Sequence, residues 1–525
     1  MNTIRLGPAK LIRPSKDVEI FVRSQAEDHL LERFPIGTFK NPVDVNAIIQ
    51  HQFNFYDSNL RRLVSRISSR DAAQFLLFQY DQASEILHGE KLDVDEARQW
   101  SSMEGTFRRS IKFILELMCM NRPVGPPAVP KEYAGSTMEI VFFLAENAVH
   151  LAEMSNRVHA MFPEQWYAMI GPKDHDHDFT LRISGPDEQF DHIFSKRVIR
   201  DRVSRNEFVP MPQFDIHTAT HQGFLDAAFS QSFGMTYGEF IFVISQMIDK
   251  AQPAPDGFPV LFIHEEKLLQ GLYQSGMSSR GIDLAVRGFS IRAEHLEEEN
   301  RTVYKPKQSS RAYRRGFFSI PHESGQHLAF SKSMARECMM LLVNSVCYQY
   351  LPSEWRSEGT KKALATLSGA AGRWFEKTVE RNLGTLGITG GRAKGWIGKG
   401  TNRIAIPDEV GELDFLGYDS QNNTIFLVEA KMTYTGLEAA FWRDDIHEFV
   451  TSKRSFAVKF RRKIEWVNRN LTEITRALGF QAVRDFKCAM ITLYPCVAAQ
   501  MIKDFKCVSV TELMLDYRER GGWPY

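Results

Sequence analysis

Residues 412–431 read ELDFLGYDSQNNTIFLVEAK, two strand-like segments joined by a short polar turn. Asp, Ser, Gln and Asn at 419–423 suit a hairpin turn, and the second segment is rich in β-branched and large apolar residues. Because side chains alternate faces along a strand, Glu429 and Lys431 are expected to point the same way. If the two segments pair, Asp414 approaches both of them. The pattern therefore predicts two carboxylates and one ammonium group at one end of a hairpin.

This trio suits chemistry on phosphodiester bonds. Carboxylate oxygens are the ligands that Mg²⁺ prefers, so Asp414 and Glu429 are candidate ligands for Mg²⁺, for which Mn²⁺ would substitute. Such a cation polarises a phosphoryl oxygen and lowers the pKa of a bound water. Lys431 is then placed to orient that water or to neutralise charge that develops on the phosphate. We therefore predict a metal-dependent nuclease site at Asp414, Glu429 and Lys431.

The segment before the hairpin supplies further candidates. Residues 361–386 predict a helix that carries Glu376, a candidate catalytic acid, with Glu380 one turn further on as its competitor. Residues 390–403 are rich in glycine and read as a loop, whose basic side chains are candidate phosphate contacts. These side chains are Arg392, Lys394, Lys399 and Arg403. A flexible, solvated connection is the alternative interpretation of the same loop.

The order of elements around the hairpin resembles a known group of enzymes. A helix with an acid, the motif G-E-L-D, a hairpin and the motif V-E-A-K are followed by a predicted helix at 444–471 and strand at 487–493. This arrangement is similar to the PD-(D/E)xK nuclease superfamily, which includes restriction endonucleases and Holliday-junction resolvases. The resemblance covers at most residues 353–525 and implies a restriction-endonuclease-like α/β domain with an αβββαβ core.

The resemblance also implies a role for each candidate residue. Asp414 and Glu429 match the two acids of the motif, and Lys431 matches its lysine. Glu376 matches the helix acid that some members carry. Leu413 stands where the superfamily's name has proline, a departure that is frequent among its members.

The rest of the chain predicts a multidomain α+β protein. Its 525 residues exceed the size at which single cores usually stop growing. Residues 1–130 read as mainly helical, because apolar residues recur three and four apart at 45–67 and 107–120. Residues 131–352 mix helical and strand-like pieces and are expected to sense, target or assemble. We place the nuclease domain at 353–525.

Composition and charge are those of a cytoplasmic protein without a membrane segment. Apolar residues make up 43% and charged residues 25%, and no run of about 18 apolar residues is present. Residues 361–525 hold 25 Lys and Arg against 19 Asp and Glu, whereas the remainder is slightly acidic. A basic C-terminal part favours a polyanionic partner, for which we expect double-stranded DNA. A homo-oligomer is a further possibility.

Four weaker patterns are interpreted as structural. The run of Asp and His at 174–178 reads as a solvated polar loop, and His217 with His221, four residues apart, as surface or structural histidines. The basic stretch 301–316 reads as an exposed loop or linker. The basic residues between 453 and 463 read as a solvated helix face, although such a face also suits a nucleic-acid backbone.

These observations lead to one expected function and two alternatives. The expected function is a Mg²⁺-dependent nuclease that cleaves phosphodiester bonds in DNA, in restriction or anti-phage defence. The first alternative is a catalytically inactive nucleic-acid-binding protein that keeps the nuclease-like fold. The second is a structural or interaction protein whose C-terminal α/β domain is unrelated to nucleases.

Overall fold

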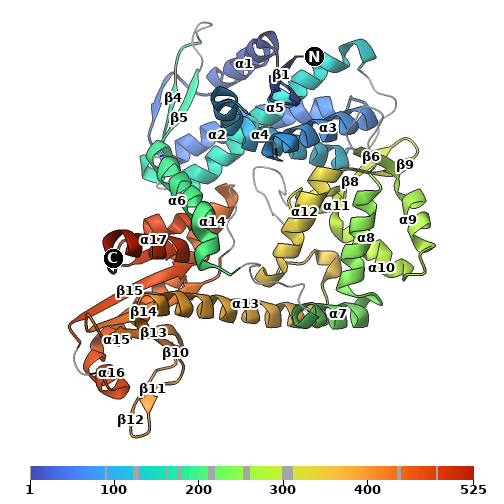
Figure 1. Ribbon diagram of the computed structural model, residues 1–525. Helices are drawn as coiled ribbons and strands as arrows, with labels where there is room; N and C mark the ends of the chain where they lie inside the picture. Colours follow the sequence, from blue (N-terminus) through green and yellow to red (C-terminus); the bar gives the residue numbers. More distant parts are fainter. Residues whose placement is uncertain are drawn as a thin grey trace. The chain divides into compact units, whose positions relative to one another are not determined.

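The structure is a computed structural model (Figure 1) that describes residues 2–88, 92–121, 129–160, 163–173, 180–185, 187–210, 219–251, 260–297, 311–433, 439–480 and 483–525. The chain is mixed α/β and divides into two compact units, each of which draws on separate stretches of sequence. Unit 1 comprises Met1–Gly185 and Ile216–Leu367, and unit 2 comprises Pro186–Asp215 and Ser368–Tyr525. The predicted boundary at 352 thus lies before the division at 367/368, and the predicted boundary at 130 lies inside unit 1.

Long helices dominate unit 1. The predicted helices at 45–67 and 107–120 are confirmed by α2 (Pro42–Val64) and α4 (Val94–Met120). Each begins at a residue whose side chain accepts backbone hydrogen bonds, Asn41 in α2 and Asp93 in α4. The other helices are α1 (Lys16–Leu31), α3 (Ser69–His88), α5 (Ala134–Ala160), α7 (Ala219–Phe233), α8 (Tyr237–Asp249), α9 (Glu265–Tyr273), α10 (Ser279–Phe289), α11 (Ala293–Glu297) and α12 (Lys332–Asn344).

Three small sheets accompany these helices. The largest has the order β6-β9-β8-β7 and joins strands that are mostly antiparallel. Its strands are β6 (Val260–His264), β7 (Ser290–Ile291), β8 (Phe317–His322) and β9 (Gly325–Ser331). The other two sheets are formed by β1 (Thr3–Leu6) with β2 (Ala9–Ile12), and by β3 (Gly37–Phe39), β4 (Tyr167–Ile170) and β5 (Leu181–Ser184).

The basic stretch predicted as an exposed loop at 301–316 is buried where the structure describes it. Residues 301–310 lie outside the described residues, but Arg311, Arg314 and Arg315 are all buried. Arg311 Nη2 lies 3.1 Å from Glu116 Oε2, and the backbone N–H of residue 312 donates to the same carboxylate at 2.9 Å. The prediction was wrong for 311–316, because the acids that neutralise these cations are far away in sequence.

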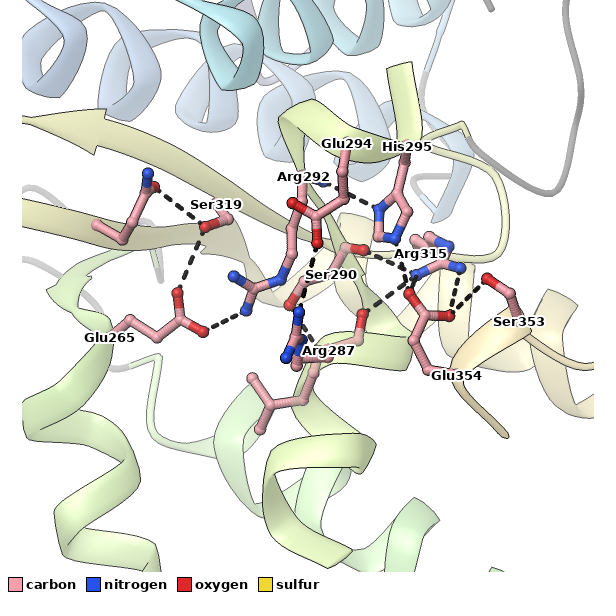
Figure 2. Close-up of polar contacts among 12 residues, drawn as sticks. Glu265, Arg287, Ser290, Arg292, Glu294, His295, Arg315, Ser319, Ser353 and Glu354 are labelled. Carbon is pink, nitrogen blue, oxygen red and sulfur yellow. Dashed lines mark hydrogen bonds and ion pairs between the residues drawn. The ribbon is translucent and has the colours of Figure 1, made fainter. Parts of the chain in front are cut away.

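Figure 2 shows the second carboxylate that holds this stretch, that of the half-buried Glu354. Arg315 donates from both terminal nitrogens to Glu354, at 3.0 and 2.8 Å, and His295 Nε2 lies 2.7 Å from the same carboxylate. Burial would raise the pKa of Glu354, but hydrogen bonds from His295 and Arg315 outweigh burial and lower it. Arg315 also donates to the carbonyl oxygen of Ser290 at 3.0 Å, so one arginine joins three segments of unit 1.

Unit 2 is built on a five-stranded sheet with the order β10-β13-β14-β15-β16 (Figure 1). The pairs β10–β13 and β13–β14 are antiparallel, and β14–β15 and β15–β16 are parallel. The predicted hairpin is confirmed, because Phe415 pairs with Val428 and Asp419 with Thr424. The strands are β10 (Ile388–Ala393), β13 (Leu413–Asp419), β14 (Thr424–Lys431), β15 (Asp485–Thr492) and β16 (Lys506–Ser509).

Helices cover the central strand on both faces. Phe426, Val428 and Ala430 of β14 pack into one core with side chains of α13 (Glu358–Thr385) and α17 (Val510–Arg520). The alternate side chains Leu427 and Glu429 are also buried and point to the opposite face. Unit 2 also contains α14 (Ala439–Ile446), a π-helical turn (His447–Thr451), α15 (Phe456–Arg469) and α16 (Leu471–Leu478).

Helix α6 (Asp187–Phe208) completes unit 2 from a distant part of the sequence. Arg197 Nη2 lies 3.0 Å from a carboxylate oxygen of Glu512 in α17, and Ser509 Oγ donates to Asp201 at 2.8 Å. Phe208, at the end of α6, is buried in the same core as the sheet. The unit therefore includes a helix that lies outside the predicted nuclease region 353–525.

Two predicted elements of unit 2 differ from the structure. Residues 390–403, expected as a loop, lie mostly in β10 and in a two-stranded hairpin of β11 (Trp396–Lys399) and β12 (Asn402–Ala405). The helix expected at 444–471 is interrupted between the π-helical turn and α15, where Ser455 accepts a hydrogen bond from the backbone N–H of residue 458 and begins a new helix.

Candidate active site

The β13–β14 hairpin brings the predicted trio together. Lys431 Nζ lies 2.7 Å from Glu429 Oε1 and 3.4 Å from Asp414 Oδ2, so one ammonium group bridges both carboxylates. The backbone N–H of Ala430 donates to Asp414 Oδ2 at 2.9 Å and fixes that side chain against β14. Strand alternation explains the cluster, since these three side chains emerge at the same end of paired strands.

A second lysine, Lys463 of α15, completes the pairing of Glu429. Its ammonium nitrogen lies 2.6 Å from Glu429 Oε2, and both side chains are buried. The interpretation of 453–463 as a solvated face is therefore wrong for Lys463. The sequence did contain a signal, because Lys463 falls on the stripe of buried residues that Phe460 and Val467 define at helical spacing. The exposed basic residues of this segment are Lys453, Arg454, Lys459 and Arg462.

The environment of Lys431 keeps its amine charged. Burial opposes the charge, but Glu429 and Asp414 outweigh burial and raise the pKa of Lys431. The ring of Phe456 lies beside it, with Lys431 Nζ 5.4 Å from the ring centre. Lys431 is therefore suited to donate hydrogen bonds and to stabilise negative charge, and unsuited to accept a proton.

Glu376 lies close enough to the trio to feel the charges of Asp414 and Lys431, and Arg392 pairs it with Glu412. Arg392 is paired with Glu412, and its Nη1 lies 3.8 Å from Glu376 Oε2. Partial burial raises the pKa of Glu376, and the negative charge of Asp414 raises it further. Glu380, the competing helix acid, is exposed. The structure thus places Glu376 within the electrostatic reach of the site and gives Arg392 two carboxylate partners.

The remaining predicted phosphate contacts lie on the β11–β12 hairpin. Lys394 lies two residues before the first strand of this hairpin, Lys399 ends that strand and Arg403 lies in the second. All three side chains are exposed. They form a group separate from the acids of β13 and β14, and their contact with nucleic acid stays a prediction.

A divalent cation would bind Asp414 and Glu429, whose oxygens are of the kind that Mg²⁺ prefers. Within the described ranges, no three His, Cys, Asp or Glu side chains are grouped as a metal site. Lys431 and Lys463 instead hold both oxygens of Glu429. The donor types fit Mg²⁺, on the condition that an ammonium group withdraws from Glu429 when the ion binds.

Two weaker candidates cannot be placed. The run at 174–178 and His217 lie outside the described residues. His221, four residues after His217, lies in α7.

The chain was compared with protein families, curated proteins and solved structures. No family model, curated protein or solved structure matches the chain. None of the helices in the described part of the chain combines the length and apolarity needed to cross a membrane.

Proposed function

We propose that the chain is a Mg²⁺-dependent nuclease of the PD-(D/E)xK type that cleaves phosphodiester bonds in DNA. The observation that carries the proposal is the convergence of Asp414 and Glu429 on the ammonium group of Lys431, at 3.4 and 2.7 Å. The order α13, β10, β13, β14, α15 and β15 supports it, because with β11, β12, α14 and α16 set aside it follows the αβββαβ order that the resemblance implies.

Each side chain has a distinct task in the proposed reaction. Asp414 and Glu429 would hold the metal, which when bound polarises the phosphate and lowers the pKa of a water. Lys431, which stays protonated, donates hydrogen bonds to the attacking water or to the phosphate oxygens as their negative charge grows. Glu376, whose pKa is raised by burial and by Asp414, adds a further carboxyl group close to the site.

By analogy with how the superfamily is used, we place this activity in restriction or anti-phage defence. A nuclease that acts without control endangers the genome of its own cell. We therefore propose that unit 1 controls the nuclease by sensing a signal or by targeting the protein. This assignment rests on the analogy alone.

Cleavage assays on the full chain test the proposal. Plasmid, linear and single-stranded DNA are incubated with Mg²⁺, Mn²⁺ or EDTA. We expect cleavage with either metal, none in EDTA, and a loss of at least about a hundredfold in Lys431→Ala. Glu465→Gln is the matched control, because this exposed carboxylate on α15 lies outside the trio. Equal cleavage by Lys431→Ala would contradict the proposal.

Calorimetry tests the metal ligands separately. Asp414→Ala and Glu429→Ala are each expected to abolish binding of Mn²⁺ that the wild type shows. Undiminished binding in both variants would remove the metal site from the proposal, whatever the cleavage assay gives.

One observation favours an alternative, a nuclease-like protein that binds nucleic acid without cleaving it. Both oxygens of Glu429 are held by lysines, as expected if the ammonium groups have replaced a metal permanently. This protein would bind DNA equally in Mg²⁺ and EDTA and cleave in neither. An unrelated C-terminal domain is less favoured, because both carboxylates lie within 3.4 Å of one nitrogen atom.

A further inference from the structure

The β11–β12 hairpin and the three residues before it, 393–405, form an arm of unit 2 (Figure 1). Trp396 pairs with Ala405 and Lys399 with Asn402 across its two strands. Ile397 is buried, and both strands pack against α16. Gly398 has a φ of +89°, and a Cβ there would approach the carbonyl oxygen of Ala477 in α16 to 2.7 Å. Only glycine permits this contact, so the hairpin is held in place by its fold.

The arm presents an exposed aromatic side chain stacked on a cation. Trp396 is 51% exposed, and Arg403 Cζ lies 4.3 Å from the centre of its ring. A guanidinium over an indole ring places a positive charge beside a flat aromatic face, a combination that suits a nucleic-acid base and its phosphate. Since an indole costs free energy when it stays in water, a partner that covers it gains by binding.

The charge of the arm points to a polyanion. Residues 393–405 carry Lys394, Lys399 and Arg403 and no acidic residue. Within the part of the chain that the structure describes, none of these three cations forms an ion pair, whereas Arg392 beside them is paired with Glu412. Unpaired cations around an exposed aromatic ring are the features of single-strand binding surfaces.

The arm begins beside the candidate active site. The pairing of β10 with β13 ends at Ala393 and Leu413, and Leu413 directly precedes Asp414. The chain leaves the sheet at that point to form the arm. A strand whose phosphate lies at Asp414 would therefore have neighbouring nucleotides within reach of the hairpin.

We propose that the β11–β12 hairpin binds an unpaired stretch of nucleic acid, with a base stacked on Trp396 and phosphates near Lys394, Lys399 and Arg403. An indole face stacks on a base only where the base has no stacked neighbour on that side, and no base in the interior of a duplex meets this condition. The inference rests on the proposed nuclease function for its partner class and narrows the substrate to DNA with a single-stranded segment.

Binding in EDTA tests the inference without requiring cleavage. The full chain is titrated with a fluorescein-labelled single strand, a blunt duplex of the same sequence and a duplex with a single-stranded overhang. We expect the single strand and the overhang to bind more tightly than the blunt duplex. Trp396→Ala is expected to weaken both about tenfold or more, and Trp396→Phe to restore most of the affinity. Phe242→Ala, which removes another exposed aromatic ring, is the control and is expected to change nothing.

Charge at the arm is tested by the salt dependence of binding. Lys399→Gln is expected to reduce the slope of log affinity against log salt for the single strand by about 0.7. Three results would each overturn the inference. Trp396→Ala could bind the single strand as tightly as the wild type does, the wild type could bind the blunt duplex more tightly than the single strand, or it could bind none of the three DNAs. If the protein never cleaves DNA but Trp396→Ala loses affinity for the single strand, the nuclease proposal is refuted and the inference that the arm binds single strands stands.

Discussion

Replacing Lys463 with methionine tests how the site accommodates a metal. Lys463 Nζ lies 2.6 Å from one oxygen of Glu429, while Lys431 Nζ lies 2.7 Å from the other. With Asp414, these groups form a neutral set of two carboxylates and two ammonium groups. Methionine is an unbranched side chain one atom shorter than lysine and carries no charge, so Lys463→Met leaves the site with one net negative charge.

We expect this variant to bind Mn²⁺ at least about tenfold more tightly than the wild type. At an effective dielectric constant of about 20, a unit charge about 5 Å from a divalent ion changes its energy by about 7 kcal/mol. About one fifth of that repulsion corresponds to a tenfold change in affinity. Without metal the variant loses a buried hydrogen bond to Glu429, which costs about 1–3 kcal/mol of stability.

The assay is calorimetric titration of the full chain with Mn²⁺, combined with thermal unfolding in EDTA and in Mn²⁺. Lys459→Met is the matched control, because Lys459 is an exposed lysine on the same helix. Lys463→Met is expected to unfold at a lower temperature than the wild type in EDTA. When Mn²⁺ replaces EDTA, its unfolding temperature is expected to rise by more than that of the control. Unchanged or weaker Mn²⁺ binding by folded Lys463→Met would refute the idea that Lys463 competes with a metal.

Three further predictions concern single substitutions. Glu376→Gln is expected to reduce cleavage about tenfold and Glu380→Gln to leave it unchanged, because of the two acids only Glu376 lies within electrostatic reach of the site. A larger loss in Glu380→Gln than in Glu376→Gln, measured in steady-state assays, would contradict the prediction. Burial raises the pKa of Asp445 to about 8, above its unfolded value of about 4, so the stability that its protonation contributes is complete below pH 4 and is lost as pH rises through 8. Asp445→Asn is therefore expected to unfold at higher denaturant concentration than the wild type above pH 8, and equal midpoints there would contradict the burial argument. Arg315→Met breaks the buried pair with Glu354 and is expected to lower the free energy of unfolding by about 3 kcal/mol in urea titrations at pH 7, whereas a loss under about 1 kcal/mol would make the pair unimportant.

The trio at the hairpin was predictable because its geometry is local. Glu429 and Lys431 are two residues apart on one strand, and a short turn at 420–423 brings Asp414 opposite them. Strand period and turn composition are properties of short segments, so sequence alone identified the pair of strands and the side chains at their ends.

Lys463 and the buried arginines were missed because their partners are distant in sequence. Lys463 neutralises an acid 34 residues away, and Arg311 is neutralised by an acid 195 residues away. A run of charged residues is interpreted as solvated when the residues that neutralise it in the folded protein are distant in sequence. The β11–β12 hairpin was read as a loop for a different reason, since glycines at positive φ support its turns and close packing while resembling a flexible linker.

Unit 2 is assembled from two separate stretches of sequence, which affects the order in which it folds during synthesis. Arg197 of α6 precedes its partner Glu512 of α17 by 315 residues, so during synthesis this helix waits on the order of 15–60 s for the strands and helix that cover it. Ten of the 22 residues of α6 are charged, which lets the helix remain in water without aggregating over that interval. A ribosome that stops before residue 512 therefore releases a chain in which α6 has no Glu512 to pair with and α17 is largely missing.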